Sequence, residues 1–221
     1  MRFRRPAAVA ATAFLAVLAV AANAQQTTTT VQDDGPDMVQ EDWELVVGAP
    51  NPTEVGPQIT TVMCPIDNST APFVAFDMNY REYPTFAPGG MQIQVWANER
   101  VTATAGQGNS LFNTQGETVT WTQKMYVSSG FLVYNIDNGS STTWGSFGQG
   151  WYLAVAVPTT MTSLSDYDPA VSARRSGASW QANHVRTLKL KQVRYYKNGQ
   201  LTWTDLSPRV VVDNTSSDDD D

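Results

Sequence analysis

The fold class is decided by VRTLKLKQVRYYKNGQLTWT, residues 185–204. A run rich in β-branched and aromatic residues, Val185 to Tyr196, is followed by a second run from Gln200 to Thr204, with Asn198-Gly199 between them. Asn-Gly favours a type I′ turn because both residues tolerate a positive φ, and this turn joins twisted antiparallel strands. The stretch therefore predicts a β-hairpin.

The rest of the chain repeats this pattern. Segments rich in Val, Thr, Tyr, Phe and Trp are separated by clusters of Gly, Pro, Asn and Ser, and no segment carries the apolar stripe of a long helix. Further turns are predicted at Ser129-Gly130 and at Asp137-Asn138-Gly139. The expected strands lie near residues 43–48, 58–63, 73–80, 91–96, 118–127, 131–137, 151–157, 185–196, 200–204 and 209–212. About ten strands with short turns predict an all-β fold, a two-sheet antiparallel sandwich or a barrel.

The N-terminal segment Met1–Ala24 has the pattern of a signal peptide. Three arginines precede an apolar run from Ala7 to Ala22, and the segment ends on the small residues Ala22-Asn23-Ala24. The run is short for a membrane span, and polar residues follow it, so no stable membrane anchor is expected. The protein is predicted to be secreted, to the periplasm or the extracellular space, and the alanine-rich signal is typical of bacteria.

Charge divides the remaining chain into three parts. Residues 25–42 are predicted to be a disordered acidic and threonine-rich spacer, residues 43–212 a β-sandwich domain, and residues 213–221 a disordered acidic tail. Without Met1–Ala24 the chain has 11 basic and 21 acidic side chains, whereas residues 43–217 are nearly neutral. Nucleic acid is excluded as a partner, because phosphate binding needs a basic surface. The oligomeric state is left open.

Two residue types occur once each, and this restricts the chemistry. Cys64 is the single cysteine, so no internal disulfide forms, and we interpret it as a small buried hydrophobe beside Val62 and Met63. His184 is the single histidine, which excludes a zinc site built from several histidines.

Alternation predicts a polar face on two neighbouring strands. Side chains at i and i+2 of a strand share a face, so the polar residues of 73–81 and 91–96 form two rows opposite the apolar ones. If the strands pair, these rows lie side by side. The predicted carbohydrate-binding residues are Asp77, Asn79, Arg81, Gln92, Gln94 and Trp96. Amides and charged groups exchange hydrogen bonds with sugar hydroxyls, and an aromatic ring covers the apolar face of a pyranose. The competing interpretation is an ordinary solvated sheet face.

Evidence for catalytic or metal chemistry is sparse. Glycoside hydrolysis uses two carboxyl groups, and no pair of acidic residues has a spacing that selects it. Asp166 and Asp168 alternate in a loop-like segment, as in calcium-binding loops, so a structural calcium ion is the one cofactor considered. No other cofactor is predicted.

The order of these segments resembles the concanavalin A-like lectin and glucanase jelly rolls. The similarity covers about residues 43–212 and is carried by Phe73–Tyr80, Gly89–Trp96, Phe131–Gly139 and Val185–Tyr196. It implies a jelly-roll sandwich that binds or cleaves polysaccharide on a sheet face. Asn79-Tyr80-Arg81-Glu82 and Gln92-Ile93-Gln94 also resemble the alginate-lyase branch, although Gln94 stands where that branch has histidine.

Three hypotheses follow for the function. The leading one is a secreted, non-catalytic protein that binds a polysaccharide or other glycan through the predicted residues. The second is a polysaccharide lyase or glycoside hydrolase on the same scaffold. The third is a structural or surface-interaction protein without a small ligand.

Overall fold

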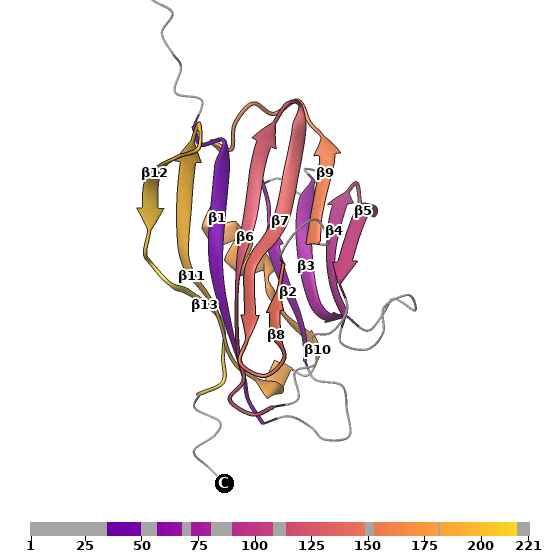
Figure 1. Ribbon diagram of the computed structural model, residues 1–221, viewed down its shortest axis with the longest axis vertical. Coiled ribbons are helices and arrows are strands. Elements are labelled where there is room, and N and C mark those ends of the chain that lie inside the picture. The colour runs from indigo at the N-terminus through magenta and orange to yellow at the C-terminus, as the bar shows by residue number, and fades with distance from the viewer. Residues whose placement is uncertain are drawn as a thin grey trace, which may run out of the picture. The chain divides into compact units, whose positions relative to one another are not determined.

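Two antiparallel β-sheets form the described part of the protein, and the larger lies in front of the smaller in Figure 1. The structure is a computed structural model, and it describes residues 35–49, 57–67, 72–80, 90–107, 114–148, 153–180 and 182–215. The predicted all-β, two-sheet antiparallel sandwich is thereby confirmed. The signal-peptide segment Met1–Ala24 lies outside the described residues.

The larger sheet has the strand order β12-β11-β1-β6-β7-β8, with β13 also pairing with β11 and β9 with β7. The smaller sheet has the order β10-β2-β3-β4-β5. The larger sheet's strands are β1 (Met38–Val47), β6 (Thr118–Ser128), β7 (Phe131–Ser141), β8 (Gly145–Phe147), β9 (Ala154–Pro158), β11 (Val185–Lys197), β12 (Gln200–Asp205) and β13 (Arg209–Asp213). Those of the smaller are β2 (Gln58–Met63), β3 (Phe73–Tyr80), β4 (Gly90–Ala97), β5 (Arg100–Gln107) and β10 (Gly177–Trp180).

The hydrophobic core lies between the two sheets. Trp43 of β1 stacks on Trp121 of β6 with ring centroids 6.2 Å apart, and Phe76 of β3 meets Trp121 edge-on at 6.0 Å. All three side chains are buried. Because alternate residues of each strand point inward, the outer faces are left to the other half of the side chains.

Tight turns with positive φ join neighbouring strands. The predicted Asn198-Gly199 turn is present, with φ of 51° and 75°, as is Ser129-Gly130, with φ of 51° and 80°. A third turn of this kind, Asn98-Glu99, joins β4 to β5 and was not predicted. Its glutamate is an unusual residue at a position with positive φ, so the sequence gives little sign of it.

The turn predicted at Asp137-Asn138-Gly139 is wrong. These residues continue β7, and the pairing of β6 with β7 shifts register between Thr120 and Thr122. Asn138 has a φ of 52°, so the same local chemistry produces a bulge within a strand instead of a turn. Gly139 leaves room for Phe147, whose ring would lie 2.4 Å from a Cβ at this position.

The strand pattern also extends beyond its expected limits. Residues Met38 to Asp42, assigned to the spacer, form the first half of β1, and Asp213, assigned to the tail, ends β13. The strands β5, β8 and β10 were not predicted. Acidic composition pointed to disorder at Glu41 and Asp42, but both carboxylates find partners within the fold, as described below.

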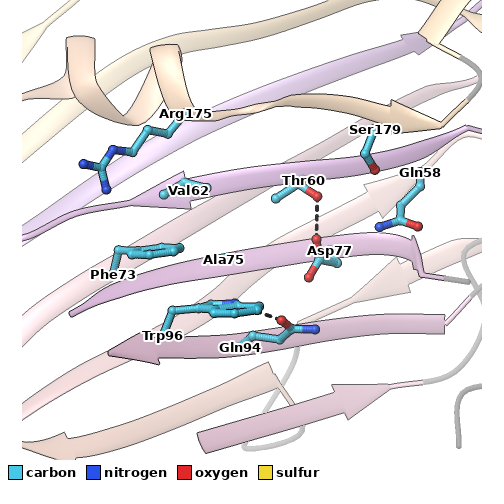
Figure 2. Close-up of a pocket in the computed structure, with 10 residues that line it drawn as sticks. All are labelled: Gln58, Thr60, Val62, Phe73, Ala75, Asp77, Gln94, Trp96, Arg175 and Ser179. Atoms are coloured by element: carbon cyan, nitrogen blue, oxygen red, sulfur yellow. Dashed lines mark hydrogen bonds between the residues drawn. The ribbon is translucent and has the colours of Figure 1, made fainter. Parts of the chain in front are cut away.

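A short helix, α1 (Pro169–Arg175), lies beside β2. The chain then continues into β10, which pairs with β2 at the edge of the smaller sheet (Figure 2). Asp168 caps it by accepting a hydrogen bond from the Ala170 backbone, and Pro169 supplies a helical φ in the first turn. Val171 of α1 packs with Val62, Cys64 and Ala75. Cys64 is buried, as predicted. Within the described ranges, no helix has the length and apolarity needed to cross a membrane.

Candidate functional site

The outer face of the smaller sheet carries three aligned rows of side chains. Strand pairing places Thr60 opposite Asp77 and Asp77 opposite Gln92, which makes one row polar. The next row joins Val62, Ala75 and Gln94, and Phe73 lies opposite Trp96 in the third. The inward-facing neighbours on β3 and β4, among them Phe76 and Ile93, belong to the core. Alternation therefore predicted correctly that Asp77, Gln92, Gln94 and Trp96 share this face.

An aromatic cluster closes one end of the face. The rings of Phe73 and Trp96 are parallel to within 2°, with centroids 6.2 Å apart. The guanidinium carbon of Arg175, at the end of α1, lies 5.7 Å from the centroid of the Phe73 ring. Phe73 thus contacts a cation and an aromatic ring, a combination that holds its plane in place. Trp96 is partly exposed.

Hydrogen-bonded polar side chains occupy the other end. Thr60 Oγ1 donates to Asp77 Oδ1 at 2.5 Å. Gln94 accepts from Trp96 Nε1 at 2.9 Å and donates to Gln92 Oε1 at 2.6 Å. Gln92, Gln94 and Asp77 are only 2–4% exposed. Their amides and carboxylate are therefore held in fixed orientations by their neighbours.

The two ends face a groove of about 400 Å³, shown in Figure 2. We call it the outer groove, and it is lined by Gln58, Thr60, Val62, Phe73, Ala75, Asp77, Gln94, Trp96, Arg175 and Ser179. These residues come from β2, β3, β4, β10 and the end of α1. The volume falls within the range of ligand pockets, roughly 300–1,000 Å³.

The predicted site residues are only partly brought together. Asp77, Gln94 and Trp96 line the outer groove, and Gln92 supports it from beside Gln94. Asn79 does not line it, because a register shift between Met78 and Tyr80 breaks the alternation there and Asn79 adopts a φ of 59°. Its side chain is buried and donates to the Pro57 carbonyl at 3.0 Å. Arg81 lies outside the described residues.

Several lining residues were not predicted. Gln58 and Thr60 alternate with Ile59 and Thr61, which face inward. Because Thr60 and Thr61 are both polar, the sequence does not show the polar and apolar alternation of this strand clearly. Phe73 lies four residues before Asp77 on β3, so alternation places it on the same face, but only the polar residues of that strand were counted as site residues. Arg175 and Ser179 are more than a hundred residues from β2 in sequence, and no local pattern places them there.

The segment proposed for calcium lies directly before α1. Asp166 and Asp168 are exposed, and Asp168 Oδ1 accepts the capping hydrogen bond from the Ala170 backbone at 2.8 Å. Across the described residues, no group of three or more His, Cys, Asp or Glu side chains is arranged to hold a metal ion. Calcium at Asp166 and Asp168 stays a prediction.

The outer face of the larger sheet is also polar, but its charges are paired with each other. Arg194 donates to both carboxylate oxygens of Asp42, at 2.6 and 2.8 Å. Gln192 and Thr122 also donate to Asp42, and Lys191 pairs with Glu44 at 3.0 Å. The described residues of this face include no aromatic pair comparable to Phe73 and Trp96.

A buried carboxyl lies on the inner face of β1. Glu41 is fully buried and accepts hydrogen bonds from Trp43, Gln123 and the Tyr167 hydroxyl. Burial raises its pKa to about 7, and the hydrogen bonds from Tyr167 and Trp43 oppose that rise. Tyr134 donates to the far side of Gln123, which extends the network to β7.

Comparison with known proteins gives little. No protein-family model matches the sequence, and no curated protein matches it. Among solved structures, the chain is similar to SCP-B, a member of the eqolisin family of peptidases in a complex with the tripeptide Ala-Ile-His. The sequence identity is 11%, the alignment covers 81% of this chain and 85% of that one, and the TM-score is 0.29.

Proposed function

We propose that this protein is a secreted, non-catalytic carbohydrate-binding protein whose ligand lies in the outer groove. The observation that carries the proposal is the juxtaposition of the parallel Phe73 and Trp96 rings with Asp77 and Gln94 across one groove of about 400 Å³. Its affiliation with the concanavalin A-like jelly rolls and its export through Met1–Ala24 belong to the same proposal.

The chemistry of the outer groove suits a sugar. Trp96 provides a partly exposed ring for the apolar face of a pyranose, and Asp77 provides carboxylate oxygens that accept from hydroxyl groups. Gln94 is held by Trp96 and Gln92, so little side-chain freedom is lost when a ligand binds. Preorganised groups of this kind raise the affinity for a sugar, which offers little apolar surface to bury.

Binding, rather than hydrolysis, is proposed because of the carboxylates. Glycosidases place two carboxyl groups about 5–9.5 Å apart across the scissile bond. Asp77 is the one carboxylate among the described residues that line the outer groove. The buried Glu41 lies on the inner face of the opposite sheet.

The first experiment is a glycan array probed with the purified protein, with and without calcium. The proposal predicts specific binding that Trp96→Ala weakens. Trp203→Ala is the matched control, because Trp203 is a tryptophan on β12, 57% exposed, outside the outer groove. A wild-type protein that binds no glycan, or equal losses in both variants, would contradict the proposal. Loss of binding on calcium removal would additionally support the Asp166 and Asp168 site.

A further inference from the structure

The segment Tyr167–Arg175, which contains α1, touches both the outer groove and the buried Glu41. On the groove side, Arg175 lies over Phe73 and donates to Cys64 Sγ at 3.4 Å. On the other side, Tyr167 immediately precedes the capping residue Asp168 and donates its hydroxyl hydrogen to Glu41. The helix has seven residues, so any shift at Tyr167 is carried to Arg175 within two turns.

Glu41 is held by groups from several elements. Trp43 Nε1 donates to Glu41 Oε2 at 2.8 Å and Gln123 Nε2 donates to the same oxygen at 3.3 Å, while Tyr167 donates to Oε1. These three partners donate to an ionised Glu41; when Glu41 is protonated on Oε1, the carboxyl group becomes the donor and the Tyr167 hydroxyl oxygen accepts, so this contact is kept in both states.

Among the described residues, no cation is in direct contact with Glu41. Tyr167 faces it from the segment before α1, Tyr134 from β7, Tyr195 from β11 and Arg209 from β13, and Cys64 interacts with it from the end of β2. Arg209 acts only through its charge and is itself paired with Asp205 at 2.7 Å. The negative charge of an ionised Glu41 is therefore poorly compensated where it lies.

We propose that Glu41 is a positioning residue for the outer groove: through Tyr167 it holds α1, and with it Arg175, and ionisation of Glu41 releases this helix. An ionised carboxylate gains hydration when the Tyr167–Arg175 segment moves away, whereas the neutral carboxyl has less to gain. The consequence for ligand affinity rests on the proposed function, but the coupling of Glu41 to α1 does not.

The direction of the pH dependence follows from linkage. Burial raises the pKa of Glu41 to about 7 with α1 in place, and once α1 has moved the pKa returns toward its ordinary value of 4.5. We call the state with α1 in place closed and the state with α1 moved away open. Between these two pKa values, Glu41 is ionised in the open state and protonated in the closed state. Opening therefore becomes more frequent as pH rises through this window, by at most about tenfold per pH unit, and levels off above about pH 7.

Cys64 reports the opening directly. It is the single cysteine of the sequence, is buried, and packs against Val171 of α1. A dithiodipyridine reagent, which reacts at acidic as well as neutral pH, forms a mixed disulfide with the Cys64 thiolate and releases one thiopyridone. The rate is measured on the full chain from pH 5 to pH 8, for the wild type and for Glu41→Gln. Dividing one rate by the other removes the pH dependence of the thiol that both proteins share. The charge of ionised Glu41 also raises the pKa of Cys64 in the wild type, which slows labelling and so opposes the predicted rise.

Glutamine reproduces the neutral form of Glu41, since its amide oxygen faces Trp43 and its amide nitrogen faces Tyr167. The proposal predicts that the ratio of wild-type to Glu41→Gln labelling rates rises at least tenfold between pH 5 and pH 7 and then levels off. A ratio that does not change with pH would overturn the proposal. Glu44→Gln, a carboxylate on the outer face of the same strand, is the control and should label like the wild type at every pH.

Tyr167→Phe keeps the proposal testable if Glu41→Gln does not fold. This variant loses the hydrogen bond to Glu41 but keeps the buried ring, so Cys64 should label faster than in the wild type at each pH. Labelling of Tyr167→Phe at the wild-type rate would contradict the proposal. Because labelling needs no glycan, failure of the proposed function and failure of this coupling give different results. If both hold, affinity for glycans found on the array should weaken between pH 5 and pH 7 in the wild type but not in Glu41→Gln.

Discussion

The rings of Phe73 and Trp96 lie parallel to within 2° across the β3–β4 pair, with 6.2 Å between their centroids. Each ring is held by a polar group as well: Arg175 lies over Phe73, and Gln94 accepts from the indole nitrogen of Trp96. The aromatic wall of the outer groove is therefore formed before any ligand binds. This preorganisation links the fold to the proposed function, since ligand binding then orders few side chains.

The stability of the protein should depend on the ionisation of Glu41. Its raised pKa means that the folded state favours the protonated form, so stability is lost as pH rises from 4.5 to about 7 and stays reduced above that range. Urea unfolding should show that Glu41→Gln gains about 3 kcal/mol relative to the wild type between pH 4.5 and pH 8. A difference that is the same at both ends of this range would argue against a buried, titrating Glu41.

Asp42 should matter more for stability than its neighbour Glu44. Asp42 accepts from Arg194, Gln192 and Thr122, and its removal leaves partly buried donors unpaired. We expect Asp42→Ala to cost about 1–3 kcal/mol in urea unfolding, and Glu44→Ala, which loses one exposed ion pair, less than about 1 kcal/mol. Equal costs for the two variants would show that the Asp42 network does not stabilise the larger sheet.

Gly139 should resist substitution because of Phe147. A Cβ at position 139 would lie 2.4 Å from the ring of Phe147, which is buried, so Gly139→Ala should destabilise the protein by about 1–3 kcal/mol. At Gly177 a Cβ meets no atom within 4 Å, so Gly177→Ala is the control in thermal unfolding. Partial recovery in the double variant Gly139→Ala with Phe147→Leu would confirm that the ring causes the loss, and a harmless Gly139→Ala would refute it.

The faces of the strands could be predicted from the sequence, whereas long-range partners could not. The period-two alternation of residues 73–78 and 91–96 placed Asp77, Gln94 and Trp96 outward, because strand geometry leaves no other arrangement. The same reasoning failed at Asn79, where a register shift interrupts the period, and at Asn138, where a residue with positive φ marks a bulge instead of a turn. The residues near Asn79 and Asn138 do not differ in type from those of a regular strand or a turn, and only the observed strand pairing shows what each segment forms.

Burial of charge was the other obstacle to prediction. Glu41 and Asp42 were assigned to a disordered spacer because their neighbourhood is acidic and polar. In the structure they lie on opposite faces of β1, with Tyr167 and Arg194 as partners that are 126 and 152 residues away in sequence. Arg175 reaches the outer groove in the same way. Contacts over such separations arise from the topology of the sheets, which composition does not encode.

The central claim, that the outer groove binds carbohydrate, is tested most directly by calorimetric titration of one glycan selected from the array into wild-type, Trp96→Ala and Trp203→Ala proteins. Circular dichroism would first verify that each variant is folded. Loss of the stacking ring should weaken binding by about 1–3 kcal/mol, roughly fivefold to 150-fold in Kd, and Trp203→Ala should bind like the wild type. Unchanged affinity in a folded Trp96→Ala protein would contradict the claim.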